Sequence, residues 1–148
     1  MMKLFRFRGG VHPKGYKEAT TAKPVQTMPM PSHLYVPVQQ HIGAPANPEV
    51  SVGDTVLKGQ LLAHSQGAVS APVHAPTSGT VVDITDLPAP HPSGLPVRTI
   101  VIESDGKDEW IEGPVVPLDS SNLSTDRVGD LVGAAGSVGR GAATFPAA

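Results

Sequence analysis

Two glycine-bearing motifs in the middle of the chain restrict its fold more than any other feature. The first, Val50 to Gln60, reads Val-Ser-Val-Gly-Asp-Thr-Val-Leu-Lys-Gly-Gln, and the second, Ala75 to Val81, reads Ala-Pro-Thr-Ser-Gly-Thr-Val. Gly53 before an aspartate suits a tight turn with positive φ, and Gly59 suits a second one, because glycine has no Cβ to clash there. Apolar and polar residues alternate around the motifs, which favours paired β-strands over residues 50–84.

The order and spacing of these motifs resemble the biotinyl/lipoyl carrier, or barrel-sandwich hybrid, family over residues 40–84. In carriers, an exposed hairpin between the two halves presents a lysine that forms an amide with biotin or lipoate. Here that position holds Gln66 to Ser70, and the nearest lysine, Lys58, belongs to the wrong turn. The sequence therefore predicts the hybrid fold without the carrier function. The alternative is a generic β-sandwich whose turns happen to contain Gly-Asp.

The amino-acid composition excludes several classes of function and favours a small β-fold. The chain has 148 residues with 16 Gly, 16 Pro and 4% aromatic residues, which favours short strands, many turns and an aliphatic core. Cysteine is absent, so the chain cannot form a disulfide, present a thiolate or hold an iron–sulfur cluster through cysteine. The net charge of -2 gives no reason to expect a nucleic-acid partner. No apolar run approaches the ~20 residues of a membrane span.

Local patterns predict the remaining elements. The expected strands cover residues 4–8, 33–38, 80–84, 97–103 and 107–111, with turns at 75–76, 78–79 and 105–106, an unpatterned arm at 11–31 and a loop at 86–96. Pro37 places the 33–38 strand at a sheet edge, because proline cannot donate to a ladder. After Ser124 and Thr125, which are possible N-caps, apolar residues recur at helical spacing.

The histidines raise the question of a metal or phosphotransfer site. They are His12, His33, His41, His64, His74 and His91. No two stand four residues apart on an expected helix, and no acidic residue joins them at ligand spacing. His74 beside Thr77 is similar only in outline to a phosphotransfer histidine on a hybrid fold. Surface or loop positions are therefore expected. As a functional loop, Gly9 to Lys14 would use His12 for titration near neutral pH and Lys14 for a phosphate, but a turn with a fixed proline is the preferred interpretation.

A glycine-rich segment near the C-terminus, Gly139 to Pro146, admits two interpretations. Small residues at Gly139, Gly141, Ala142 and Ala143 would let backbone N–H groups approach a phosphate. Alternatively, the segment is the flexible end of the preceding helix, since glycine commonly ends helices. The last ~30 residues are too few to bury a core of their own, so we expect the chain to be the front of a longer protein.

Together, these motifs resemble the N-terminal part of the C subunit of the Rnf electron transport complex, an ion-translocating ferredoxin:NAD oxidoreductase. The matching residues keep their order: Gly-Gly-Val-His-Pro from Gly9, Gln-His-Ile-Gly-Ala-Pro-Ala from Gln40, Val52–Asp54, Lys58–Gln60, Ala71–Val81, and Gly-x-Gly-x-Ala-Thr-Phe-Pro from Gly139. The resemblance implies a hybrid domain, then a Rossmann-like domain similar to the flavin- and NADH-binding subunit of respiratory complex I. A β-grasp-like segment and a ferredoxin domain with two 4Fe-4S clusters would follow.

The resemblance also implies a division of the chain and a set of site residues. It divides the chain into a strand and arm (1–32), a mainly β barrel-sandwich hybrid domain (33–116) and the start of a nucleotide-binding, Rossmann-like α/β domain (117–148). The implied glycine-rich nucleotide loop comprises Gly139, Gly141, Ala142, Ala143, Phe145 and Pro146. Ala142 stands where the family usually has glycine, and its methyl group would crowd a phosphate. No catalytic residue, metal ligand or cofactor is expected in this chain, because the 4Fe-4S clusters, FMN and NADH are implied only for the full-length family.

Three functions stay open at this point. The first is a structural or docking segment of the Rnf C subunit, which would contact the membrane subunits of the Rnf complex from the cytoplasmic side of the bacterial inner membrane. In that case the chain is peripheral and not catalytic by itself. The second is a stand-alone carrier or phosphotransfer module without a lysine acceptor. The third is a pure protein-binding module that presents a sheet edge to one partner.

Overall fold

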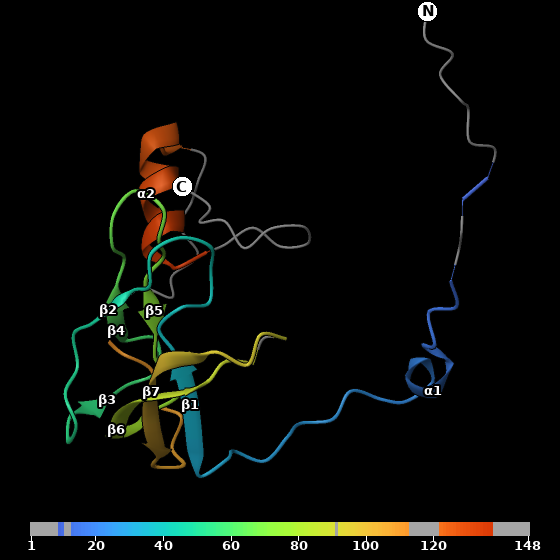
Figure 1. Cartoon of the computed structure of the whole chain (residues 1–148), viewed down its shortest axis with the longest axis horizontal. Helices are drawn as coiled ribbons and strands as arrows, with labels where there is room; N and C mark the ends of the chain where they lie inside the picture. The colour runs from blue at the N-terminus through green and yellow to red at the C-terminus, as the bar shows by residue number, and fades with distance from the viewer. Residues whose placement is uncertain (1–8, 11–12, 91, 113–121, 138–148) are drawn as a thin grey trace, which may run out of the picture.

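The computed structural model describes residues 9–10, 13–90, 92–112 and 122–137. Its strands form two antiparallel sheets that pack together, while a short helix lies far out on the N-terminal arm and a longer helix follows the sheets (Figure 1). In chain order the elements are α1 (Glu18–Thr21), β1 (His33–Pro37), β2 (Asn47–Pro48), β3 (Thr55–Val56), β4 (Leu61–His64), β5 (Val73–His74), β6 (Gly79–Pro88), β7 (Pro96–Ser104) and α2 (Thr125–Ala134). The mainly β class predicted from the sequence is confirmed.

The larger sheet has four strands in the order β1-β7-β6-β3. Its centre is the long hairpin of β6 and β7, in register from Gly79 opposite Ser104 to Pro88 opposite Pro96. The β7 strand is rich in β-branched residues, and its segment 100–102 is buried without a break. Because successive strand residues point to opposite faces, this strand is covered on both sides.

The smaller sheet has three short strands in the order β2-β4-β5, and one aliphatic core joins it to the larger sheet. The buried members of this core are Val36, Val38, Ala46, Val56, Leu62, Ala63, Val73, Ala75, Val81, Ile100 and Ile102. They come from both sheets and from the residues next to the strands, and none is aromatic. Two small sheets closed over one aliphatic core are the arrangement that the hybrid fold requires.

The two glycine-bearing motifs pair with each other as predicted. β3 pairs with β6 and β4 pairs with β5, so residues 50–84 meet as strands. Gly53 has φ +97° and Gly59 has φ +82°, which confirms positive φ at both turns. The backbones of the motifs also bond directly, from Gly53 N–H to Val81 O at 2.7 Å and from Val81 N–H to Asp54 O at 2.9 Å.

Gly79 has a different role from the one expected. The sequence placed it in a turn, but it is the first residue of β6 and pairs with Ser104. A Cβ on Gly79 would lie 2.1 Å from the backbone oxygen of Glu103. This glycine is therefore required by close approach of two backbones rather than by an unusual φ.

Three strand boundaries were wrong. The ladder of β6 and β7 continues into the expected loop at 86–96, and Ala89 N–H bonds to Leu95 O beyond its last pair. The prolines of this segment lie at the turn end of the hairpin, where they do not interrupt the bonds of the inner pairs. The expected strand at 107–111 is no strand but a segment with a single parallel bridge, Lys58 to Trp110. The first motif becomes extended only at Thr55, after the turn.

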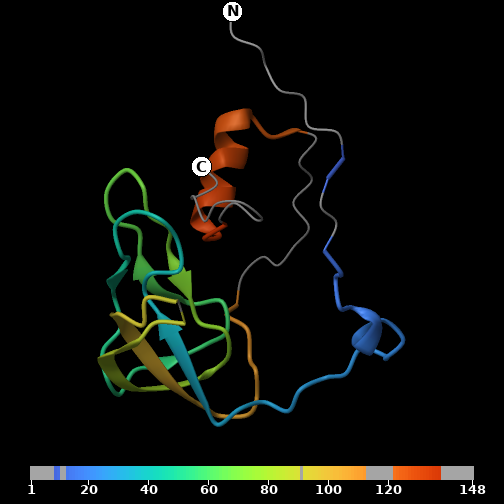
Figure 2. The ribbon, with the colours of Figure 1, turned by 45° about the vertical axis from the view of Figure 1, so that its right-hand side comes forward.

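Residues 13–32 form an arm that runs away from the sheets, as both ribbon views show (Figure 2). Its one helix, α1, has four residues. At the other end of the chain, the predicted helix and one of its two proposed caps are confirmed: Ser124 Oγ accepts from Arg127 N–H at 3.3 Å, and α2 ends before Gly136, whose φ is +67°. The strand expected at residues 4–8 and the glycine-rich loop from Gly139 to Pro146 lie outside the described residues.

Gly53→Val is expected to destabilise the chain by about 1–2 kcal/mol, because a β-branched residue resists positive φ. No atom lies within 4 Å of the position that a Cβ would take there, so the cost comes from the backbone alone. Thermal unfolding measures it, and Ser51→Val is the matched control, since it places the same side chain at an exposed neighbouring position. Equal melting temperatures for Gly53→Val and the wild type would contradict the assigned turn.

Candidate functional site

A segment after β7 crosses both motif turns, and we call residues 105–111 the strap. Its backbone brackets Lys58: Lys58 N–H bonds to Glu109 O at 2.8 Å, and Ile111 N–H bonds to Lys58 O at 3.0 Å. On the other motif, Ser78 is fully buried, and its hydroxyl accepts from Glu109 N–H at 2.9 Å. The same hydroxyl donates to Asp105 Oδ1 at 2.7 Å. The strap therefore ties the first motif to the second through paired hydrogen bonds.

Asp108 is the centre of the strap. Its Oδ2 lies 2.6 Å from Lys58 Nζ, and its Oδ1 accepts from Thr77 Oγ1 at 3.1 Å. The residue has φ +55°, a left-handed conformation that aspartate tolerates better than most side chains. Lys58 Nζ also lies 5.0 Å from the centroid of the Trp110 ring, within reach of a cation–π contact. The lysine nearest to the carrier position is thus half-buried and held by an ion pair and a ring.

Hydrogen bonding lowers the pKa of both strap aspartates below the ordinary carboxyl value. For Asp108 the largest cause is the hydrogen bond from Lys58, and Thr77 adds to it. For Asp105 it is the hydrogen bond from the Lys107 backbone N–H, followed by the one from Ser78. A lowered folded-state pKa stabilises the fold above the unfolded pKa, and this stabilisation is lost as the pH falls through the folded value.

The hairpin between β4 and β5 occupies the place where carriers present their lysine. Residues 65–69 are exposed, and Gly67 has φ +71°, a backbone conformation that favours glycine. The described hairpin carries no lysine, which agrees with the sequence analysis. In both ribbon views a second loop, residues 39–46, lies beside this hairpin at the same end of the sheets (Figure 2).

The 39–46 loop is bonded to one side of the hairpin. Ala44 N–H bonds to Val69 O at 3.0 Å, and Ser70 Oγ donates to Ala44 O at 2.9 Å. A Cβ on Gly43 would lie 2.1 Å from Val69 O, so only glycine permits this approach. The hairpin is therefore packed against its neighbour instead of standing free.

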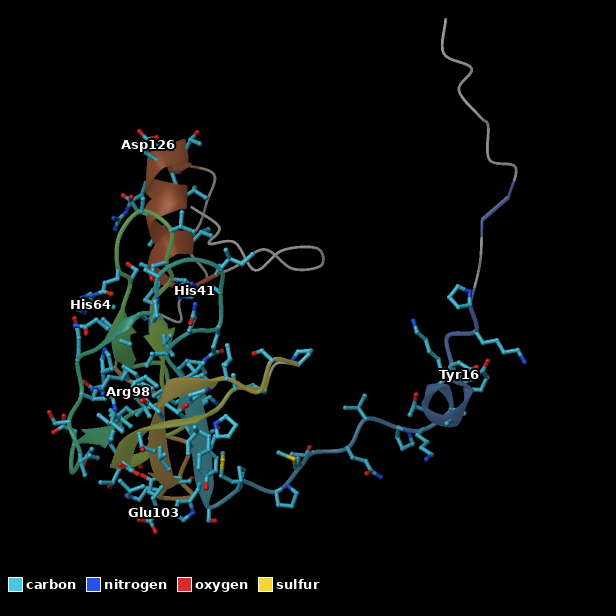
Figure 3. The ribbon with its side chains drawn as sticks, viewed as in Figure 1. Tyr16, His41, His64, Arg98, Glu103 and Asp126 are labelled. Atoms are coloured by element: carbon cyan, nitrogen blue, oxygen red, sulfur yellow. The ribbon has the colours of Figure 1, made fainter. Side chains whose placement is uncertain are left out.

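His41 completes this contact and is the site residue that the sequence analysis missed. It was expected at the surface, but its exposure is 7%. Figure 3 labels it at the hairpin end of the sheets. Its Nε2 accepts from Ala71 N–H at 3.1 Å, so the ring is the neutral tautomer whose Nδ1–H donates to Ile42 O at 3.1 Å. The signal available in the sequence was its position within the Gln40–Ala46 motif, among small residues and proline that allow close packing.

The other described histidines do not lie next to one another, although His74 shares a cavity with His41. His33 is exposed, and His64 Nδ1 lies 3.0 Å from Glu49 Oε1 in a half-exposed pair. His74 lies with His41 on a cavity of about 200 Å³, which Gly136 at the end of α2 also lines. Burial lowers the pKa of His74. His12 and His91 lie outside the described residues.

A second, larger cavity of about 840 Å³ adjoins the 39–46 loop on its other side. The tip of the β6–β7 hairpin forms its far wall. Its lining is mostly apolar or prolyl and includes Pro37, Ile42, Pro90, Leu95 and Pro96. The hairpin end of the domain therefore combines two loops that are bonded to each other with two concave surfaces.

Within the described ranges, no group of three or more His, Asp, Glu or Cys side chains is placed to hold a metal ion. The predicted nucleotide residues, Gly139, Gly141, Ala142, Ala143, Phe145 and Pro146, fall outside those ranges, so their role stays a prediction. Neither described helix has the length and apolarity needed to cross a bilayer.

Comparison with known proteins gives one consistent family. Residues 5–107 match the family described as RnfC barrel sandwich hybrid domain. The chain is 49% identical over 148 residues to the C subunit of the ion-translocating oxidoreductase complex of Rhodobacter capsulatus, covering 99% of this chain and 28% of that protein. It is 50% identical over 143 residues to the C subunit of the proton-translocating ferredoxin:NAD(+) oxidoreductase complex of Clostridium ljungdahlii. This match covers 97% of this chain and 31% of that protein. The C subunit of the ion-translocating oxidoreductase complex of Pseudomonas aeruginosa is 49% identical, and this match covers 100% of this chain and 19% of that protein.

Asp108→Asn is expected to reduce stability at pH 7 and to flatten the loss of stability below pH 3.8, the ordinary aspartate pKa. Asparagine keeps the shape and tolerates the left-handed backbone, so the variant isolates the charge opposite Lys58. Urea unfolding between pH 7 and pH 2.5 measures both effects. Glu103→Gln, which removes an exposed carboxylate outside the strap, is the control. Parallel pH curves for wild type and Asp108→Asn would refute the role given to this pair.

His41→Leu is expected to destabilise the chain by about 1–3 kcal/mol, because it leaves the N–H of Ala71 and the carbonyl of Ile42 without their partner. The matched control is His33→Leu, at an exposed histidine, which is expected to change stability by less than about 0.5 kcal/mol. Urea unfolding at pH 7 compares them. Similar values for the two variants would show that His41 does not fasten the 39–46 loop to the hairpin.

Proposed function

Since this chain belongs to the RnfC barrel sandwich hybrid family, we propose that it is the N-terminal scaffold of the C subunit of an ion-translocating electron transport complex. Its role there is structural: it holds the redox parts of the subunit against neighbouring subunits. The chain spans about 28% of the Rhodobacter capsulatus relative, so the activity of the whole protein is part of this proposal.

One observation carries the proposal: the hairpin that a carrier would use as a swinging arm is bonded to a neighbouring loop. Val69 and Ser70 are hydrogen-bonded to Ala44, and buried His41 bonds to Ala71. A swinging arm needs an exposed attachment point that moves with its cargo, whereas a scaffold needs a surface that keeps its shape. The contacts favour the second use.

The redox chemistry of the proposed complex belongs to parts of the subunit other than the described sheets. The Clostridium ljungdahlii relative is a subunit of a complex named as a ferredoxin:NAD(+) oxidoreductase, and we propose the same coupling here. In the full-length subunit, 4Fe-4S clusters, FMN and NADH would supply electron transfer. The subunit would lie peripherally on the cytoplasmic side of the bacterial inner membrane, against the membrane subunits.

The proposed division of the chain into domains places the hybrid fold between an N-terminal arm and the start of a nucleotide-binding domain. Residues 1–32 form the strand and arm, residues 33–116 the hybrid domain, and residues 117–148 the start of the nucleotide-binding α/β domain. The loop from Gly139 to Pro146 would approach a nucleotide phosphate in that domain, with the Ala142 methyl group limiting how closely. The α2 helix supports a connection between the parts, since Gly136 beyond its end lies against Pro72 and His74 of the hybrid domain.

The purified chain is expected to carry no lipoyl, biotinyl or phosphoryl group, to retain no flavin and to oxidise no NADH. Intact-mass measurement of the chain expressed in bacteria tests the first point, and absorbance with an NADH assay tests the others. A covalent adduct of any of the three groups would replace the scaffold proposal with a carrier or phosphotransfer function. Stoichiometric retention of FMN would contradict the structural role.

The chain is also expected to bind the detergent-solubilised remainder of an Rnf complex from which the C subunit has been removed. Binding follows from the scaffold role, because a docking domain retains its surface when the redox domains are absent. Affinity capture with the purified remainder measures it, and the His41→Leu variant tests the contribution of the hairpin end. No binding by the wild-type chain would contradict the proposed function.

A further inference from the structure

Charge is divided unequally between the arm and the hybrid domain. Residues 1–32 hold six basic residues and one acidic residue, a formal charge of +5, whereas residues 33–112 hold three basic and nine acidic residues, a formal charge of -6. The net charge of -2 for the whole chain conceals this contrast. Such a division concentrates attraction for acidic partners in one short segment.

The described arm, residues 13–32, is exposed along its whole length. Apolar side chains share this exposure, at 80% for Tyr16, 102% for Val25, 76% for Met28 and 42% for Met30. The link to the sheets is at its base, where Ser104 N–H bonds to Ser32 O at 2.8 Å. Figure 3 shows Tyr16 far from the labelled residues of the hybrid domain.

The arm combines lysines and apolar side chains in an extended form. Lys14 and Lys17 lie on its outer half and Lys23 at its middle, and prolines at 13, 24, 29 and 31 limit helix to the four residues of α1. An arm of this kind cannot form the long amphipathic helix that lies in a membrane interface. An extended segment with alternate side chains suits a groove on a protein, where both backbone and side chains find partners.

Several acidic groups of the hybrid domain are already engaged within it. Asp105 and Asp108 bond to the motif turns, Asp54 accepts from Ser51 N–H at 2.8 Å, and Asp86 lies 3.6 Å from Arg98. These carboxylates stabilise turns and pairs of their own domain. For these four groups, holding the arm of the same chain would mean giving up those partners. The arm also runs away from the sheets that carry the other acidic residues (Figure 2), which favours an acidic surface on another molecule.

We propose that residues 13–32 are a docking arm that binds an acidic groove on another protein subunit of the complex, with Lys14, Lys17 and Lys23 facing its carboxylates and Val25 and Met28 filling apolar pockets. This inference rests on the proposed function for the identity of the complex. The acidic hybrid domain is repelled by the same surface, so the arm sets the distance and direction of the contact.

Charge reversal in the arm tests the proposal, with the full chain and the solubilised remainder of an Rnf complex lacking its C subunit as binding partner. The triple variant K14E/K17E/K23E is expected to weaken binding at least about tenfold, and K23E alone several-fold. The matched control is R127E, which reverses one exposed charge on α2 and gives the whole chain the same net charge as K23E. It is expected to bind within about twofold of wild type.

The salt dependence of binding and a pair of apolar substitutions distinguish the ionic contacts of the arm from its apolar contacts. Raising the salt from 50 to 500 mM is expected to weaken wild-type binding more than binding of the triple variant, because salt screens the lysines that only wild type has. V25S/M28S is expected to weaken binding while keeping the wild-type salt dependence. All of these positions are exposed, so the melting temperatures of the variants are expected to match that of wild type.

Each alternative result has a distinct meaning. Equal binding by wild type and the triple variant would overturn the docking arm while leaving the scaffold proposal in place. No binding by wild type would overturn both. Vesicles of phosphatidylcholine and phosphatidylglycerol at 3:1 provide the lipid comparison. The vesicles could bind wild type as tightly as the remainder of the complex does, and fail to bind the triple variant. That result would show that the arm binds an anionic membrane and would overturn the proposed protein groove.

Discussion

The structure depends on the contact between the strap and the two motif turns. β3 and β5 have two residues each, which is too little ladder to hold the halves of the fold in register by themselves. The strap supplies the missing connection, because Asp108 joins Lys58 on one motif to Thr77 on the other. Buried Ser78 is satisfied by the same segment, which removes the cost of placing its hydroxyl in the core.

Closing the motifs in this way has a consequence at the far end of the sheets. The β4–β5 hairpin grows from strands that the core and the strap have already positioned, so its tip is presented at a defined place. The 39–46 loop then meets it through Ala44 and His41, and glycine at 43 permits the close approach. The position of the hairpin end therefore depends on the bonds at the turns as well as on its own contacts.

The sequence was sufficient for the parts of this fold that depend on local chemistry. Positive φ at Gly53 and Gly59, the cap at Ser124 and the alternating strand before Asp105 are properties of a few neighbouring residues. It was insufficient where partners lie far apart in the chain. Gly79 occurs in a turn-like context, but its role comes from Glu103, and buried His41 depends on Ala71. The strap has a strand-like pattern, yet it bonds to turns, because β1 already occupies the free edge of β7.

The absence of a lysine from the β4–β5 hairpin and the packing of that hairpin against the 39–46 loop are physically linked. A carrier lysine at the hairpin tip needs water around its long side chain and freedom to swing, and a loop bonded beside it would restrict both. Here Gln66 to Ser70 carry no amine, and the flank bonds to the 39–46 loop: Val69 O accepts from Ala44 N–H, and Ser70 Oγ donates to Ala44 O. Once that flank is occupied, restoring a lysine at the tip would not restore a swinging arm, because the base of the hairpin is fixed. In this fold a free hairpin suits a swinging arm and a hairpin bonded at its flank suits positioning, so the bonds of Ala44 and His41 support the proposed scaffold role.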